Sequence, residues 1–241
     1  MDLIGFMGLI ASTGSPNAKQ ERAIEPHDFW QSFEADPIKA PYRDRYPARL
    51  PDGRFLFLPI RPLAGTDYAI ASLILNQASF AVEEALSGVL AQRVASARPD
   101  VVVGLPTLGL SLARLVAQRL GHPRFVALGT SRKFWYDPAL SLPMASITSP
   151  GQEKRLFVDP RMVPLLAGKR VCLIDDVISS GTSMRAGLDL LALVDVTPVC
   201  IGAAMLQTSR WQNLIAEATP VEGAISTPLL RKAEGGWIED D

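Results

Sequence analysis

Short apolar runs alternate with helical patterns through the middle of the chain, and this alternation permits few folds. Four segments read as short buried strands: Asp100–Leu105, Arg124–Leu128, Val171–Asp175 and Pro198–Met205. Between them, Leu110–Leu120 and Thr182–Val194 carry apolar residues at helical spacing. Continuous apolar strands between helices are typical of parallel sheets covered on both faces. We therefore predict an α/β fold with a doubly wound, mostly parallel sheet.

The sequence on either side of this central region predicts less regular structure. At 241 residues the chain is long enough for one domain with a few appended elements. We expect a helix or arm over residues 1–12, loops over 12–53, a strand at Phe55–Ile60, and one long or two short helices over 67–97. Beyond the core we expect a helix over 209–218, a strand at Ala224–Leu230, and a partly disordered end over 234–241. The predicted division is an N-terminal arm with hood elements (1–60), a core (61–206), and a C-terminal hood and tail (207–241).

Residues 131–153 show no sustained period and contain three prolines, Pro138, Pro143 and Pro150. A long segment without structure is unusual inside a compact domain. This one follows a predicted strand directly, where open α/β sheets place their ligands. We therefore favour a mobile active-site lid over a missed helix. Lys154–Val158 then alternates like an edge strand.

The composition argues against several classes of protein. A net charge of −1 disfavours a sequence-independent nucleic-acid binder. No apolar run approaches the ~20 residues of a membrane span, and Asp2 stands where a signal peptide has basic residues, so we expect a cytoplasmic protein without a membrane partner. Cys172 and Cys200 lie in apolar runs and are expected to be buried free thiols in adjacent strands, in preference to a disulfide. With only two histidines and no CxxC spacing, a zinc site is disfavoured.

The segment Leu173–Ser183 carries the clearest chemistry. An apolar strand leads into Asp175 and Asp176, and a loop of hydroxyl residues with Gly181 then opens a helix. Unpaired N–H groups at a helix N-terminus, hydroxyl donors and a glycine suit a phosphate group. Two acids beside such a loop suit neutral hydroxyl donors, for example those of a ribose. The alternative is a serine that merely caps the helix beside two surface acids.

Residues 171–183 resemble the signature with which type I phosphoribosyltransferases bind phosphoribosyl diphosphate (PRPP). The resemblance implies that Asp175 and Asp176 hold the ribose hydroxyls. It also implies that the 5′-phosphate lies among Ser179, Ser180, Gly181, Thr182 and Ser183. It covers about residues 98–206 and is weak in the flanks.

Two further segments resemble the diphosphate-binding parts of that family. The loop Gly104–Gly109 resembles its diphosphate loop, which implies contacts from Pro106, Thr107, Leu108 and Gly109. Many members carry Arg or Lys where Thr107-Leu108 stands in this chain. Arg132 and Lys133 resemble the Arg-Lys pair that reaches the diphosphate; the alternative is two solvated cations at a strand end.

Residues 134–153 take the place of the family's flexible loop, which closes over the reacting centre. Such loops often contribute a cation, and the resemblance implies that Lys154 is this cation and binds the diphosphate. Phe134, Trp135 and Tyr136 are interpreted as contacts of a homodimer in preference to base-stacking residues. The homodimer itself is an implication of the resemblance.

The implied activity is that of a pentosyltransferase that moves the 5-phosphoribosyl group from PRPP to a nucleobase, with Mg²⁺ and release of diphosphate. Asp175, Asp176 and Lys133 are the candidate catalytic residues, and Mg²⁺ would be held mainly by PRPP with help from the two aspartates. Resemblance to adenine- and xanthine-type enzymes favours a purine over a pyrimidine.

One alternative is a PRPP-sensing regulator without transferase activity, although residues 12–53 do not read as a helix-turn-helix. A serine hydrolase is disfavoured because the run around Ser111 lacks the second glycine of a nucleophile elbow.

Overall fold

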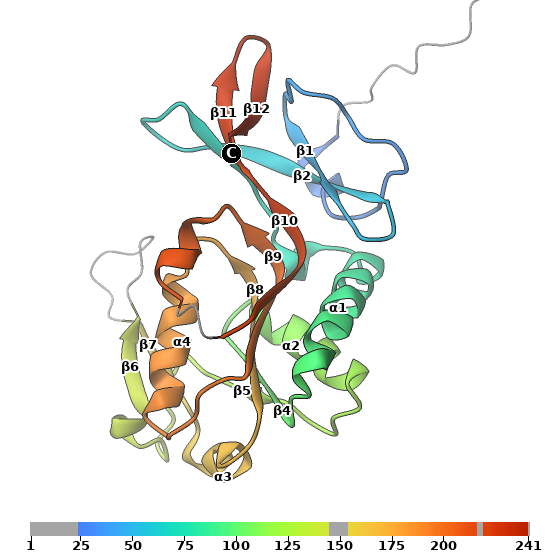
Figure 1. Cartoon of the computed structure of the whole chain (residues 1–241). Coiled ribbons are helices and arrows are strands. Elements are labelled where there is room, and N and C mark those ends of the chain that lie inside the picture. Colours follow the sequence, from blue (N-terminus) through green and yellow to red (C-terminus); the bar gives the residue numbers. More distant parts are fainter. Residues whose placement is uncertain (1–23, 145–153, 216–218, 241) are drawn as a thin grey trace, which may run out of the picture.

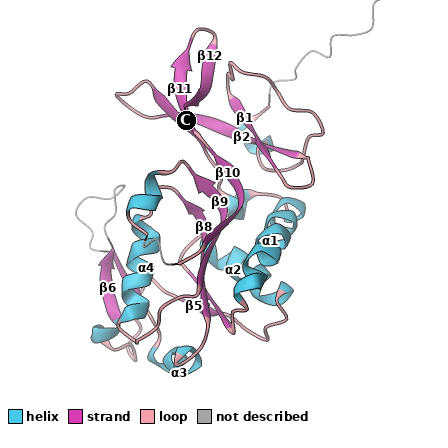
Figure 2. Ribbon diagram, viewed as in Figure 1, coloured by secondary structure: helices cyan, strands magenta, loops and turns pink. Residues whose placement is uncertain are grey.

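The computed structural model describes residues 24–144, 154–215 and 219–240. Two sheets dominate it: a parallel sheet covered by helices, and an antiparallel sheet that stands beyond one end of it (Figures 1 and 2). The predicted N-terminal helix or arm lies outside the described residues.

The parallel sheet confirms the predicted α/β class. Its strands are β4 (Val101–Gly104), β5 (Val126–Ala127), β8 (Val171–Ile178), β9 (Cys200–Gln207) and β10 (Val221–Thr227), in the order β10-β9-β8-β4-β5, and every neighbouring pair is parallel. Helices α1 (Phe80–Val94) and α2 (Gly109–Arg119) cover one face, and α4 (Thr182–Ala192) covers the other (Figure 1). The short α3 (Val163–Leu166) precedes β8. Cys172 and Cys200 are opposite each other on β8 and β9 as buried free thiols, as expected.

Strand β8 is longer than predicted. The sequence placed its end at the two carboxylates, but pairing with β9 continues to Ile178, which is opposite Leu206. Val177 and Ile178 are both good strand formers, and Ile178 is buried, so the ladder does not stop at the polar residues.

The antiparallel sheet, called the hood sheet below, joins the two flanks of the chain. Its strands are β1 (Arg45–Arg49), β2 (Phe55–Pro62), β3 (Tyr68–Ala71), β11 (Leu229–Ala233) and β12 (Gly236–Asp240), in that spatial order. The strand predicted at Phe55–Ile60 is confirmed as part of β2. The helices predicted over 67–97 are partly wrong, because the segment begins as β3 and helix α1 starts only after Ser79, whose side chain caps it.

The C-terminal segment departs most from the predictions. A helix was predicted over 209–218, but the described part forms only the 3₁₀ turn η6 (Arg210–Asn213). The predicted strand Ala224–Leu230 is divided at Pro228, so that β10 lies in the parallel sheet and β11 in the hood sheet. The predicted disorder of the end is also wrong for residues 236–240, which form β12. Glu239 on β12 accepts hydrogen bonds from the hydroxyls of Tyr42 and Tyr46.

The predicted lid is partly regular. Residues Ser141–Met144 form β6, which pairs antiparallel with β7 (Lys154–Phe157), the predicted edge strand. A 3₁₀ turn, η4 (Pro138–Leu140), precedes β6, and the β6–β7 pair packs along α4. The sequence did not predict β6 because four alternating residues, Ser141–Met144, are too few for a recognisable strand pattern. Its partner β7 is also separated from it in the sequence by residues 145–153. Residues 145–153 lie outside the described residues.

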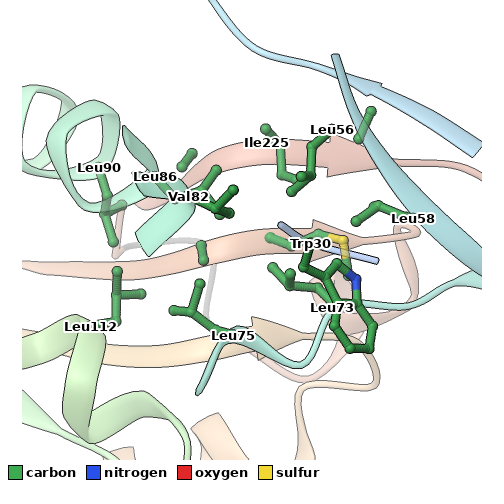
Figure 3. Close-up of a cluster of buried hydrophobic side chains, with 14 of the residues drawn as sticks. Trp30, Leu56, Leu58, Leu73, Leu75, Val82, Leu86, Leu90, Leu112 and Ile225 are labelled. Atoms are coloured by element: carbon green, nitrogen blue, oxygen red, sulfur yellow. The ribbon is translucent and has the colours of Figure 1, made fainter. Parts of the chain in front are cut away.

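The hood sheet and the parallel sheet share one hydrophobic core. Leu56 and Leu58 of the hood sheet pack in the same cluster as Leu86 and Leu90 of α1, with Ile225 of β10 between them (Figure 3). Trp30 is buried in the same cluster, and its indole Nε1 donates a hydrogen bond to the carbonyl of Ser72 at 3.0 Å. The hood sheet is therefore held against the core by extensive apolar packing.

Candidate functional site

Three of the predicted motifs lie on or shortly after neighbouring strands of the parallel sheet. The carboxylates lie on β8, the loop Gly104–Gly109 follows β4, and Arg132 and Lys133 come after β5. Strands β8, β4 and β5 are adjacent and parallel, so their C-terminal ends meet at one edge. The fold thus brings to one edge segments that are far apart in the sequence.

The two carboxylates are buried in this structure. Asp175 and Asp176 are only 7% and 8% exposed, and the backbone N–H of Asp176 donates to Asp175 Oδ1 at 2.9 Å. Burial, and then the charge of Asp176, raise the pKa of Asp175 well above its ordinary value. Burial also raises the pKa of Asp176. A cation or a set of hydroxyl donors placed here would favour the ionised forms and is what such a pair is suited to bind.

The diphosphate loop touches this pair at Gly109, the first residue of α2. A Cβ atom at Gly109 would lie 2.7 Å from Asp175 Oδ1 and 2.8 Å from Asp175 Cα. Real Cβ atoms do not approach other atoms this closely, so only glycine allows the start of α2 to lie against β8. The segments predicted to hold ribose and diphosphate are therefore in direct contact.

The loop Ser179–Ser183, called the phosphate loop below, surrounds a small cavity. The cavity has a volume of about 90 Å³ and is lined entirely by residues 177–184. Gly181 has a φ of +84° and precedes α4 directly. The hydroxyls of Ser180 and Thr182 are 3.0 Å apart. A positive φ at the glycine turns the chain so that the first N–H groups of α4 face the cavity, which is the arrangement that binds an anion.

Trp211 was not predicted to belong to the site. A Cβ atom at Gly181 would lie 3.3 Å from the Cα, Cβ and O atoms of Trp211, so the turn η6 packs on the phosphate loop. The indole Nε1 of Trp211 donates to the carbonyl of Thr208 at 3.0 Å, which fixes the ring. A tryptophan soon after a buried strand was the signal available in the sequence, but the segment was interpreted as a helix.

The diphosphate loop is as free of charge as its sequence indicates. Pro106 and Leu108 are half-buried and Thr107 is exposed, and the peptide bond between Pro106 and Thr107 is cis. The backbone N–H of Leu105 donates to the carbonyl of Ile174 at 2.8 Å, which aligns the loop with β8. What this loop offers an anion is backbone N–H groups and one hydroxyl.

Arg132 and Lys133 are exposed, and within the described ranges neither has an ion-pair partner. The turn that follows them is fastened to the protein. The Trp135 ring stacks under the Arg161 guanidinium at 4.8 Å, and Asp159 accepts from Arg161 Nη2 at 2.6 Å and from Trp135 Nε1 at 3.5 Å. The Trp135–Asp159–Arg161 cluster thus restrains the turn that carries the two cations.

Two other predicted residues, Lys154 and Phe134, have described contacts only with other segments. Lys154 begins β7, whose packing partners are β6 and α4, and its side chain lies outside the description. Phe134 is 95% exposed and its ring contacts that of Trp135 edge-on at 4.8 Å. Neither position is tied by a described contact to the carboxylates or the diphosphate loop.

Gln207, also missed by the sequence reasoning, connects the site edge with the hood sheet. It is the last residue of β9 and is buried, and its Nε2 donates to the carbonyl of Ala71 on β3 at 2.6 Å. The signal available in the sequence was a single amide side chain at the end of an apolar run.

The described residues hold no group of three or more His, Cys, Asp or Glu side chains arranged for a metal ion. Within the same residues, no helix is long and apolar enough to cross a membrane.

Comparison with known proteins decides the family. The model of the phosphoribosyl transferase domain matches residues 73–222, which include β4, β8 and the loops after them. The chain belongs to this family. The type I fold expected from the sequence is thereby confirmed, with its parallel sheet and hood.

Two curated relatives are similar to about half of the chain. The chain is 26% identical over 131 residues to an orotate phosphoribosyltransferase of Halorhodospira halophila, covering 54% of each chain. It is 29% identical over 116 residues to the transcriptional regulator GfcR of Archaeoglobus fulgidus, covering 48% of this chain and 51% of that one. The chain thus spans about half the length of the curated relatives it matches.

Among solved structures, the adenine phosphoribosyltransferase of Giardia lamblia, complexed with 9-deazaadenine, matches with a TM-score of 0.56 and 20% identity. That match covers 70% of this chain and 93% of the other. The adenine phosphoribosyltransferase of Saccharomyces cerevisiae matches with a TM-score of 0.53 and 17% identity, covering 69% and 93%. At these identities the likeness establishes the shared fold.

Proposed function

We propose that this chain transfers the 5-phosphoribosyl group of PRPP to a nucleobase and releases diphosphate. The observation that carries the proposal is the cavity inside Ser179–Ser183, which directly follows the strand that carries two buried carboxylates. Such a pairing suits one ligand that carries a phosphate and neighbouring hydroxyl groups.

In this proposal the 5′-phosphate occupies the cavity of the phosphate loop. The first N–H groups of α4 and the hydroxyls of Ser180 and Thr182 donate to it. Trp211, packed on Gly181, keeps the loop in the binding conformation. A preformed loop lowers the entropy that the protein loses when the ligand is bound.

Asp175 and Asp176 receive the ribose hydroxyls and orient C1. In the reaction the bond between C1 and the diphosphate oxygen breaks, and its electron pair leaves with the diphosphate. A ring nitrogen of the base supplies the electron pair of the new bond to C1. Carboxylates close to the ribose ring stabilise the positive charge that develops on it.

The donor set fits Mg²⁺, which is usually held by one or two carboxylates together with substrate phosphates. Asp175 and Asp176 are such carboxylates, and burial raises the pKa of both, so a bound cation would favour their ionised forms. Bound with PRPP, the ion would neutralise charge on the departing diphosphate. The chain's own residues hold the ribose and keep both ends of PRPP in place.

We assign the diphosphate to the loop Pro106–Gly109, where Thr107, Leu108 and Gly109 carry the backbone N–H groups and Pro106 has none. Arg132 and Lys133 supply positive charge. Lys133 is the proposed catalytic cation, because charge on the leaving group grows during the reaction. Lys154, at the start of β7, is proposed as a further cation for the diphosphate, as the family resemblance implies.

A purine is the proposed base. The support is the resemblance of the lid and of the segment Ala224–Leu230 to adenine- and xanthine-type enzymes, together with the fold shared with two adenine phosphoribosyltransferases. We also propose a homodimer, with exposed Phe134 as a contact residue.

A second candidate function is a PRPP-binding regulator without transferase activity. Two observations favour it: the uncharged Thr107-Leu108, and the match to a transcriptional regulator over 116 residues. In such a protein the phosphate loop and the carboxylates would still bind PRPP.

The two candidates are separated by incubating the protein with PRPP, Mg²⁺ and each nucleobase in turn and measuring diphosphate release. We expect release with one purine. PRPP binding without turnover on any base would establish the regulator in its place. If the protein neither binds PRPP nor releases diphosphate, both functions are wrong.

A further inference from the structure

A second hollow lies at the opposite end of α2 from the diphosphate loop. It has a volume of about 300 Å³ and is lined by Arg114, Ala117 and Gln118 of α2 and by residues 122–125, which lead into β5. Helix α2 starts beside Asp175 and runs for 11 residues, which separates its two ends by about 16 Å. The hollow is therefore distinct from the candidate site.

The end of α2 builds one wall of this hollow. Gly121 has a φ of +80° and donates its N–H to the carbonyl of Gln118 at 3.0 Å, and His122 donates its N–H to the carbonyl of Ala117 at 2.9 Å. These two bonds form the usual glycine-terminated helix end. They turn the chain back on itself, so that residues 122–125 lie beside the last turns of α2.

Two guanidinium groups face the hollow without compensating charge. Arg114 and Arg124 are both exposed, and none of the lining residues is acidic. In the part of the chain that the structure describes, neither guanidinium group has a hydrogen-bond or ion-pair partner. Arg119, in the last turn of the same helix, is by contrast paired with Glu84. Arg119 is the basic residue in the last turn of α2, where it complements the negative end of the helix dipole, so Arg114 and Arg124 are not needed for that role.

His122 supplies an independent observation. Its Nδ1 atom is buried and lacks a hydrogen-bond partner among the described residues. Buried polar atoms in native proteins nearly always have a partner. The ring as a whole is only half-buried, and turning it by 180° would exchange Nδ1 with Cδ2 without changing its shape. A hydrogen-bonding group of a ligand in the hollow would give this atom a partner.

We propose that this hollow binds a small organic phosphate. The phosphate dianion lies between Arg114 and Arg124, because planar guanidinium groups match phosphate oxygens and two of them balance its charge. His122 turns to donate from Nδ1. The apolar faces of Pro123 and Phe125 receive the organic part, and the volume is at the lower end of that of small-molecule sites.

The test is a titration of the ¹⁵N-labelled full chain with phenyl phosphate, followed by NMR. The backbone amides of His122, Arg124 and Phe125 report on the hollow, and those of Ser179–Ser183 report separately on the phosphate loop. We expect the first set to shift in a saturable way. In Arg114→Gln and in Arg124→Gln the Kd from these signals should rise about tenfold, the loss of one charge-assisted hydrogen bond. The phosphate-loop signals should titrate as in the wild type.

The matched control is Arg98→Gln, which removes an exposed arginine elsewhere and should leave the Kd unchanged. Benzyl alcohol, which lacks the charge, should not shift the signals. The proposal is wrong if the amides near His122 do not saturate, if Arg98→Gln weakens binding as much as the other two variants, or if benzoate binds as tightly as phenyl phosphate. None of these readouts depends on transferase activity.

Discussion

At the scale of single residues, the site depends on two carboxylates and on two glycines, Gly109 and Gly181, where a larger residue would collide with a neighbouring segment. Asp175 and Asp176 were identified from the sequence because paired acids before a hydroxyl-rich loop are a specific pattern. The contact of Gly109 with Asp175 was not predicted, because it joins residues on different strands and depends on how the helix and the sheet pack. The same holds for Trp211 and Gly181.

Gly109→Ala tests this contact. A methyl group at this position must push the start of α2 away from Asp175, so we expect a loss of about 1–3 kcal/mol in the free energy of unfolding and weaker PRPP binding. Gly129→Ala is the control, since a Cβ atom there meets nothing within 4 Å. Urea denaturation and calorimetric titration with PRPP measure both effects. Equal behaviour of the two variants would refute the role of the close contact.

At the scale of elements, the cluster of Trp135, Asp159 and Arg161 determines how the turn bearing Arg132 and Lys133 is held. Hydrogen bonds from Arg161 lower the pKa of Asp159 from 3.8 to about 2. Because the folded-state pKa lies below that of the unfolded chain, the ionised Asp159 stabilises the fold above pH 3.8. This stabilisation is lost as the pH falls from 3.8 towards 2.

Asp159→Asn should therefore be less stable than the wild type at neutral pH, and the difference should shrink between pH 5 and pH 2. Thermal unfolding of both proteins across this range measures the difference. Asp137→Asn is a suitable comparison, because Asp137 is exposed and caps only the short turn η4. A difference between wild type and Asp159→Asn that stays constant with pH would show that the carboxylate charge contributes nothing.

At the scale of the whole molecule, the parallel sheet was predictable and the hood sheet was not. Strands β4, β5, β8 and β9 fall in apolar runs that can be recognised locally, whereas β10 is interrupted by polar residues and its second half was predicted as part of a hood strand. The hood sheet pairs β3 with β11, which lie on either side of the core in sequence, and no local pattern encodes such a pairing. Residues 67–71 were therefore interpreted as helical and residues 236–240 as disordered, although both are strands.

Gln207→Leu tests how the hood sheet is coupled to the site edge. The variant keeps the size of the side chain and loses the buried hydrogen bond to Ala71, so we expect a loss of about 1 kcal/mol in stability. If the hood sheet helps to enclose the base, the KM for the base should rise more than the KM for PRPP. Gln92→Leu, at an exposed position on α1, is the control. A variant with unchanged stability and unchanged KM values would contradict this coupling.

The central claim is that PRPP binds at β8 and the phosphate loop, and calorimetric titration with PRPP and Mg²⁺ tests it most directly. The wild type should bind one PRPP per chain. Asp176→Asn removes a carboxylate at the ligand edge, so it should weaken binding by about tenfold or more without loss of fold. Asp36→Asn, which changes an exposed aspartate outside the sheet, should bind as the wild type does. Wild-type affinity in Asp176→Asn, or no binding by the wild type, would contradict the account.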